Sequence, residues 1–317
     1  MQISLQSANN VNGGVQNGHN TNPIQRHQVG VFSPAFGAAS TAYGRALVSL
    51  QDLNTDEDLI YQCKNIIATF LPNDVNIHRP NLNLNKGVIW FKAGEEFEQY
   101  KGLYKDDYHI CGYLNNQNKP KSIYILNGKT NEIDVIDVEN SEFRHFTSDE
   151  VKSLREYKYH PEAIHSKLRH DKDIYSGTWK EENEKTIEIL TELFNDKTKT
   201  DKAKENIVLY RALQPDLTKE EVEQLNKVGG VYTDKSFCST STTLENAQRF
   251  RNKNDSPVLE ISFPKDAEYI DVEKMFNIDR QHWRENEYLL NRNSSFRVTG
   301  FDKKNNIIKV DYIQEQG

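Results

Sequence analysis

The sequence has 317 residues, of which 36% are hydrophobic and 27% charged, a balance typical of soluble globular proteins. This length suits one large domain or two of ordinary size. The formal net charge of −7 argues against a general attraction to nucleic acid or anionic lipid. No apolar run reaches the roughly 18 residues that a membrane helix needs, so we expect neither nucleic-acid binding nor membrane insertion.

The first 45 residues differ in composition from the rest of the chain. They are rich in Asn, Gln, Ser and Gly, and no acidic residue occurs before Asp52. Such a segment buries too little apolar surface to offset the entropy of ordering it, which predicts a disordered tail over 1–45. A polar, acid-poor amino terminus is also typical of type III secretion substrates, which implies an optional secretion chaperone as partner.

A helical and then β-rich region is predicted over 46–165. The segment after Thr55 carries an apolar stripe at helical spacing, formed by Leu59, Cys63, Ile66 and Ile67. Between 86 and 147 the pattern changes to period two, with a hairpin signal at Asn127-Gly128. The region contains no recognisable chemical motif. Its role is left open between target or chaperone recognition, extension of the catalytic unit, and packing support.

The remaining chain, 166–317, alternates helices and strands. A charged helical stretch leads to a strand at 205–213 and then to a helix with a Thr218/Glu221 capping box. Two short strands, a short helix and a further strand follow. A long loop is predicted over 264–284, before a final strand and hairpin.

The cysteines offer no sign of a disulfide framework or a metal site. Cys63, Cys111 and Cys238 are odd in number and widely spaced, and they form neither a CxxC pair nor a zinc-type cluster with histidine. We therefore expect free thiols in a protein that works in a reducing cytosol, without a metal.

Three segments of the carboxy-terminal half carry candidate chemistry. Arg211 lies in an otherwise apolar strand, where a buried guanidinium would need an anionic partner. Ser239, Thr240 and Ser241 end another strand. Glu285 and Glu287 stand two apart, on the same side of an extended chain. Each segment alone has an ordinary explanation, namely an exposed arginine, turn chemistry and a solvated strand end.

In this order the three segments form a signature that resembles the Arg–Ser–Glu class of bacterial mono-ADP-ribosyltransferases, over roughly residues 170 to 313. The resemblance implies an α+β fold with two small, mainly antiparallel sheets packed face to face, flanking helices, and NAD in the cleft. It also implies a catalytic domain over 166–317, acting as a monomer. The asparagine usual near the helix before the arginine strand is not clearly placed.

The resemblance also implies roles for individual residues. Arg211, with Ala212 beside it, would bind the NAD pyrophosphate, and Ser239 would support the nicotinamide ribose and Glu287. Glu287 would stabilise the oxocarbenium-like transition state, and Glu285 would activate an arginine acceptor. The further NAD contacts are Thr240, Ser241 and Phe250.

Target recognition is implied for the loop that precedes the glutamate pair. Phe276 and Trp283 are two aromatic residues of this loop, and each either contacts the target protein or packs the loop against the domain. The implied function is transfer of ADP-ribose from NAD to a host protein, by an effector secreted from a bacterium into the host cytoplasm.

Other functions remain compatible with the same residues. Water in place of a protein acceptor would make the chain an NAD glycohydrolase. A silent site would leave an interaction module, although the presence of Arg211, Ser239 and Glu287 together argues against this. Glu285 favours arginine as acceptor over residues such as threonine without excluding them.

Overall fold

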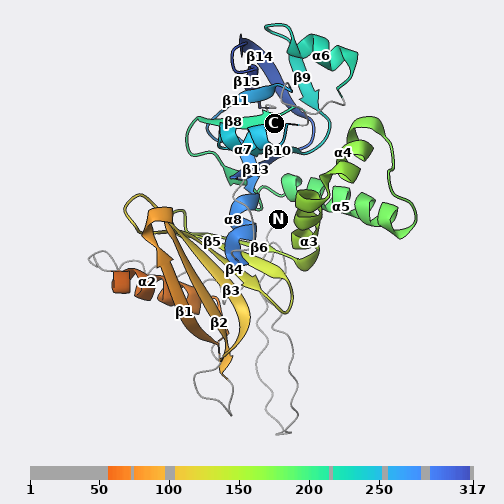
Figure 1. Ribbon diagram of the computed structural model, residues 1–317. Coiled ribbons are helices and arrows are strands. Elements are labelled where there is room, and N and C mark those ends of the chain that lie inside the picture. The colour runs from red at the N-terminus through yellow and green to blue at the C-terminus, as the bar shows by residue number, and fades with distance from the viewer. Residues whose placement is uncertain are drawn as a thin grey trace, which may run out of the picture.

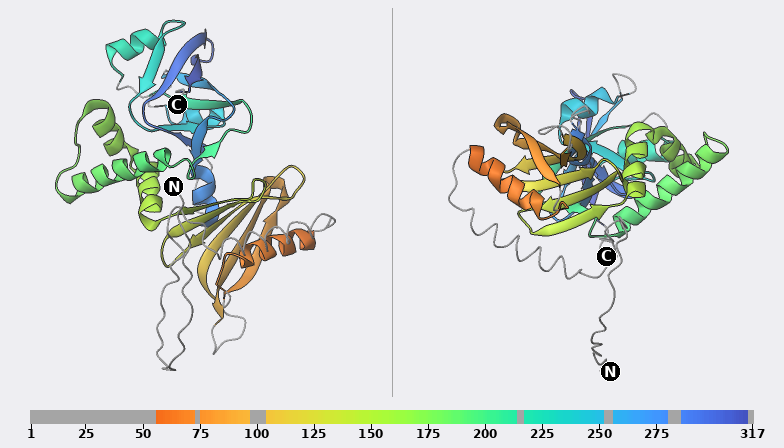
Figure 2. Two further views of the ribbon diagram at one scale, coloured as in Figure 1. Left: turned by 180° about the vertical axis from the view of Figure 1, so that it is seen from behind. Right: turned by 90° about the horizontal axis from the view of Figure 1, so that it is seen from below.

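The computed structural model describes residues 56–72, 75–96, 104–213, 217–251, 256–279 and 286–314. Two sheets dominate these residues, a six-stranded sheet and a nine-stranded one, and helices α3–α5 and α8 lie beside and between them (Figures 1 and 2). The predicted tail over 1–45 lies outside the described residues.

The first sheet is an antiparallel meander whose strands are neighbours in chain order. Its strands are β1 (Asn76–Asn83), β2 (Val88–Glu96), β3 (Tyr104–Leu114), β4 (Pro120–Asn127), β5 (Glu132–Asp137) and β6 (Glu142–Phe146), with the 3-10 turn η1 (Leu84–Lys86) between the first two. The hairpin predicted at Asn127-Gly128 is confirmed, because Asn127 pairs with Glu132 across the turn. The Asn127 side chain also accepts hydrogen bonds from the backbone N–H groups of Lys129 and Thr130.

Both faces of this sheet are buried. Helix α2 (Asp56–Ala68) packs its predicted apolar stripe on one face, against side chains such as Ile123 and Ile125. Tyr124 and Leu126 alternate to the other face of β4, where they join a core with helices α3 and α5. The first region is therefore covered on one side by the helices that lead into the carboxy-terminal half.

Three helices connect the sheets: α3 (Ser148–Tyr159), α4 (Pro161–His170) and α5 (Thr178–Asn195). Helix α3 starts with a complete capping box between Thr147 and Glu150, and α4 starts with Pro161 at a position where its missing N–H is not needed. The predicted boundary between 165 and 166 falls inside α4, so this division of the chain stays a prediction.

The nine-stranded sheet consists of two halves joined by one bridging pair, Ser241 with Tyr210. One half has the order β7 (Asp201–Lys202), β12 (Glu268–Asp271), β13 (Glu287–Leu290), β10 (Cys238–Ser241). The other has the order β8 (Ile207–Ala212), β11 (Val258–Phe263), β15 (Ile307–Ile313), β14 (Ser294–Asp302), β9 (Val231–Asp234). All of its pairings are antiparallel except that of β11 with β15.

The two halves enclose a common hydrophobic core. Leu209 and Leu259 of one half and Leu290 of the other belong to it, with aromatic side chains such as Phe296. The predicted α+β class, with two mainly antiparallel sheets and flanking helices, is confirmed.

Short elements complete this part of the chain. Helix α6 (Lys219–Leu225) has the predicted Thr218/Glu221 capping box, and α7 (Leu244–Arg249) is capped by Thr243. Gly229, after α6, has a φ of 83°, and a Cβ on Gly230 would lie 2.1 Å from the carbonyl oxygen of Gln224. Both positions therefore require glycine.

The segment 264–284 is not simply a loop, which corrects the sequence prediction. It contains β12, helix α8 (Val272–Phe276) and the 3-10 turn η2 (Asn277–Asp279). Helix α8 lies between the two sheets (Figure 1). Tyr113 of the first sheet donates to the carbonyl of Lys274 at 3.3 Å, and Trp90 donates to that of Asn277 at 3.4 Å. Residues 264–279 of this segment are ordered because their apolar side chains enter the core between the sheets.

Candidate active site

A cavity of about 150 Å³ lies where the two halves of the second sheet meet helices α3, α4 and α7. Its walls contain most of the residues singled out in the sequence. The lining residues are Tyr157, Lys158, Pro161, His165, Tyr210, Arg211, Ala212, Ser239, Thr240, Ser241, Ala247, Phe250 and Glu287. The structure thus brings together three segments far apart in sequence, around the single bridge between the halves.

Glu287 and Ser239 form the contact at the centre of this cavity. The antiparallel register of β10 and β13 places Ser241 opposite Glu287 and Ser239 opposite Leu289. The Ser239 hydroxyl reaches diagonally across the pair and donates to Oε1 of Glu287. Glu287 is 4% exposed, and burying a carboxylate without hydrogen-bond or ion-pair partners is costly. Serine and glutamate are therefore held as a unit.

The second oxygen of Glu287 has a partner from a helix. Nζ of Lys158, in the last turn of α3, lies 2.8 Å from Oε2, and both side chains are 5% exposed. This ion pair joins the helical layer to the strand that carries Glu287. Lys158 was not predicted, because α3 has many charged residues and no motif distinguishes the one that points into the site.

Arg211 is a buried residue of an interior strand, since β8 lies between β10 and β11. Its guanidinium donates to Oδ2 of Asp234 at 2.8 Å and to the carbonyl oxygen of Ser239 at 2.6 Å. Burial alone would lower the pKa of Arg211, but neighbours that include Asp234 outweigh it and hold the pKa above its ordinary value. The exposed-arginine interpretation is excluded, and the anionic partner expected for a buried arginine is Asp234.

Asp234, at the end of β9, is shared by two guanidinium groups. Arg169 of α4 binds it in a bidentate manner, with Nε at 3.0 Å and a terminal nitrogen at 2.9 Å. Burial raises the pKa of Asp234, yet the charges of Arg211 and Arg169 lower it below the usual value overall. Neither Asp234 nor Arg169 was predicted, since each lies in a segment without a motif.

The remaining predicted NAD contacts also line the cavity. Ala212, Thr240 and Ser241 are buried, and the Thr240 hydroxyl donates to the carbonyl of Tyr288 at 2.7 Å. Phe250, which follows α7, is 52% exposed. Because this ring is exposed at the edge of the cavity, a planar group can stack on it. A ring packed in the hydrophobic core would not be accessible in this way.

The predicted target-recognition residues have different outcomes. Phe276 is 4% exposed and packs in the core beside Arg155, whose guanidinium carbon lies 5.6 Å from its ring centroid. Phe276 therefore packs α8 against the protein, which corrects the expectation of a target contact. Glu285 and Trp283 lie outside the described residues, so their roles stay predictions.

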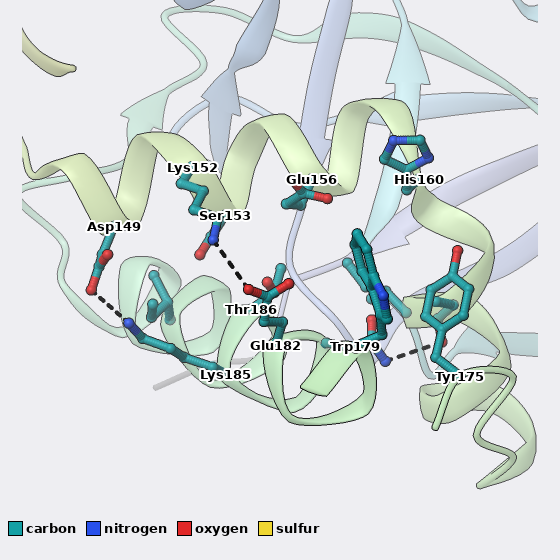
Figure 3. Close-up of a pocket in the computed structure, with 14 residues that line it drawn as sticks. Asp149, Lys152, Ser153, Glu156, His160, Tyr175, Trp179, Glu182, Lys185 and Thr186 are labelled. Carbon is teal, nitrogen blue, oxygen red and sulfur yellow. Dashed lines mark hydrogen bonds and ion pairs between the residues drawn. The ribbon is translucent and has the colours of Figure 1, made fainter. Parts of the chain in front are cut away.

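A second hollow, of about 350 Å³, lies between α3 and α5, away from Glu287 (Figure 3). Trp179 and Tyr175 form one end of it, with ring centroids 6.3 Å apart, and Asp149 pairs with Lys185 at the other. Lys152 of α3 faces this hollow, near Glu182, whereas Lys158 of the same helix faces the cavity with Glu287. Helix α3 thus borders two separate cavities.

The described residues were also compared with the requirements of a metal site and of a membrane-spanning helix, and they meet neither. Among them, no group of three or more His, Cys, Asp or Glu side chains is placed to hold a metal ion. Within the same ranges, no helix is long and apolar enough to cross a membrane.

Comparison with known proteins places the chain in a family. The sequence model of the ADP-ribosyltransferase exoenzyme family matches residues 106–315, more than half of the chain. No curated protein sequence matches. Because the family model spans the cavity and all three predicted segments, the resemblance noted in the sequence is confirmed.

Solved structures of the same kind of enzyme resemble part of the chain. ADP-ribosyltransferase Vis from Vibrio splendidus, in complex with agmatine, is 20% identical over 53% of this chain and 76% of its own, with a TM-score of 0.40. C3stau2 from S. aureus, solved with NAD, is 14% identical over 54% of this chain and 89% of its own, with a TM-score of 0.38. The Salmonella SpvB ATR domain is 16% identical over 53% of this chain and 100% of its own, with a TM-score of 0.38.

The protein belongs to the ADP-ribosyltransferase exoenzyme family and is an NAD⁺–protein ADP-ribosyltransferase with the α+β fold of that family.

Proposed function

We propose that the protein transfers a single ADP-ribose unit from NAD to an arginine side chain of a host protein. The observation that carries this proposal is the buried carboxylate of Glu287, held by Ser239 in a cavity that Arg211 also lines. These are the three residues of the Arg–Ser–Glu signature.

Glu287 is the proposed transition-state partner. When the bond between the anomeric carbon and nicotinamide breaks, the bonding electrons leave with nicotinamide and positive charge develops on the ribose. A fixed carboxylate beside that sugar stabilises the charge as it forms. Ser239 keeps the carboxylate in place, and Arg211 supports Ser239 through its backbone carbonyl.

Glu285 is the proposed general base that activates the acceptor arginine. A guanidinium has a pKa above about 12 and is a poor nucleophile until a base takes a proton. Glu285 would accept that proton while the guanidinium nitrogen forms the new bond to the anomeric carbon. Phe250, exposed beside the cavity, is proposed to stack on the nicotinamide ring.

The setting of this activity is proposed from composition. The acid-poor segment 1–45 supports a secretion signal, with a chaperone as its optional partner and the host cytoplasm as the place of action. The three described cysteines are buried free thiols, which supports a reducing compartment. We propose a monomer that binds NAD and one host target.

The test uses purified protein, labelled NAD and a eukaryotic cell lysate, with Glu287→Ala as the inactive control and exposed Glu223→Ala as the matched one. We expect one discrete labelled host protein with the wild type and with Glu223→Ala, and none with Glu287→Ala. Nicotinamide release without a labelled protein would instead identify an NAD glycohydrolase. The absence of any NAD turnover would identify a silent binding module.

The division of labour between the two glutamates has its own test. Glu285→Ala should abolish transfer to protein while part of the slow NAD hydrolysis remains, because only Glu287 serves the sugar. Both activities can be followed in one reaction, as labelled target and as free nicotinamide. Equal loss of both in Glu285→Ala would contradict the separate roles.

A further inference from the structure

Lys158 reaches the site from outside the three signature segments. Its ammonium pairs with Oε2 of Glu287 at 2.8 Å, while Ser239 donates to Oε1. The Lys158 ammonium neutralises the negative charge of Glu287. The same negative charge would otherwise stabilise the developing oxocarbenium ion. The pair must therefore be weakened before Glu287 can act on the sugar.

The cavity also has to accommodate a diphosphate, which carries two negative charges. Among the described residues that line it, Lys158 and Arg211 are the permanent cations. Arg211 is already bound to Asp234 and to the Ser239 carbonyl, and its guanidinium is buried between them. These contacts link β8 to β9 and β10 around the site. They also orient the guanidinium of Arg211 toward Asp234 and the Ser239 carbonyl.

Lys158 differs from Arg211 in its freedom to move. A lysine ammonium is a compact charge on a flexible four-carbon stem, with three donors that can rotate. Lys158 is anchored at the last turn of α3 and its side chain lines the cavity. The ammonium can therefore exchange one anionic partner for another without a change in the backbone.

We infer that Lys158 is a second diphosphate-binding residue of this transferase, in addition to the one expected at Arg211, and that its ammonium passes from Glu287 to the diphosphate when NAD binds. The inference rests on the proposed function. The exchange couples two events, because the charge that recognises the diphosphate is the one that leaves Glu287 free to face the ribose. Binding of the correct substrate thus prepares the catalytic carboxylate.

The experiment measures NAD and ADP-ribose affinities by calorimetry, together with kcat and KM for NAD hydrolysis. The variants are Lys158→Met, which keeps the length of the side chain without its charge, and Lys158→Arg, which keeps the charge. Lys152→Met is the matched control, since Lys152 lies on the same helix but faces the other hollow, 3.6 Å from Glu182 (Figure 3).

We expect Lys158→Met to weaken NAD and ADP-ribose binding by about 10- to 100-fold, the range for one charge-assisted hydrogen bond. Lys158→Arg should recover most of that affinity, and Lys152→Met should match the wild type. A residue that only positions Glu287 would lower kcat and leave ADP-ribose affinity unchanged, and this result would overturn the inference.

A second pair of variants, Glu287→Gln with and without Lys158→Met, separates the loss of binding from a folding defect. Such a defect could arise in Lys158→Met alone, because the buried carboxylate of Glu287 would lose its counter-ion. In the Glu287→Gln background a neutral amide replaces the carboxylate that pairs with Lys158, so Lys158→Met no longer leaves a buried carboxylate without its counter-ion. We still expect the loss of ADP-ribose affinity in this background. Unchanged affinity there would overturn the inference, whereas failure of the wild type to bind NAD at all would contradict the proposed function itself.

Discussion

Tyr157 and Phe237 join the helical layer to the catalytic strand. The buried hydroxyl of Tyr157 donates to the backbone carbonyl of Phe237 at 2.9 Å, directly before β10, and the two rings meet edge to face. Tyr157 is one residue before Lys158, and Phe237 is two residues before Ser239. This bond therefore positions both partners of Glu287 at once.

Loss of this hydroxyl should destabilise the protein measurably. Tyr157→Phe keeps the ring but leaves the carbonyl of Phe237 without that donor, at a cost of about 1–3 kcal/mol in the free energy of unfolding. Urea unfolding followed by circular dichroism would measure it. A change within about 0.5 kcal/mol would show that the bond contributes little.

Replacement of Glu287 should remove NAD turnover without preventing folding. We expect Glu287→Gln to lower kcat for NAD hydrolysis by at least about 10²–10³, the scale for loss of a preorganised transition-state partner. The neutral amide still accepts from Ser239 and keeps the shape of the side chain. Circular dichroism should match the wild type, and retention of more than about a tenth of the activity would refute the role of Glu287.

Asp234 should contribute to stability in a pH-dependent manner. Its pKa is lowered in the folded protein, so its contribution is present above the unfolded value of about 3.9 and is lost as pH falls through the folded pKa. Asp234→Asn leaves the guanidinium groups of Arg169 and Arg211 without their shared anion, which should cost about 3–5 kcal/mol at pH 7. Urea unfolding between pH 3 and pH 7 should show that the free energy of unfolding falls less steeply toward acid pH in the variant than in the wild type. Parallel curves would contradict this linkage.

The cysteines should be unreactive in the folded protein. Burial raises the pKa of Cys63 and of Cys238 to about 12, so little thiolate forms at pH 8. A thiol reagent such as DTNB should modify none of the three within minutes in native buffer and all three in guanidinium chloride. Rapid modification of Cys238 in native buffer would show that the core behind β10 opens readily.

Local patterns in the sequence predicted much of the fold and the strands of the site. The stripe of α2, the hairpin at Asn127-Gly128 and the capping box at Thr218 all formed as predicted, because each depends on contacts between residues close in sequence. The Ser239–Glu287 contact was predicted from the family signature, which relates residues far apart in the sequence. Hydrophobic periodicity alone does not show which distant residues come together.

The missed features are long-range pairs between charged residues. Lys158, Arg169 and Asp234 come from three elements, and nothing in their local sequence separates them from the many solvent-exposed charges of the same helices and turns. The regular structure within 264–279 was missed for a related reason. Phe276 is buried in a cluster with side chains of the first sheet. The composition of the segment resembles that of a loop and does not indicate these packing partners.

The core shared by the first sheet, α3, α5 and α8 has a consequence for how this chain could be recombined. Tyr124 and Leu126 of β4 and Leu289 of β13 belong to one cluster. A genetic exchange that replaced the amino-terminal half with an unrelated module would expose part of the hydrophobic core of the catalytic half. The two halves should therefore be inherited together, and a shortened gene starting at residue 166 should yield an insoluble product that lacks the helix carrying Lys158.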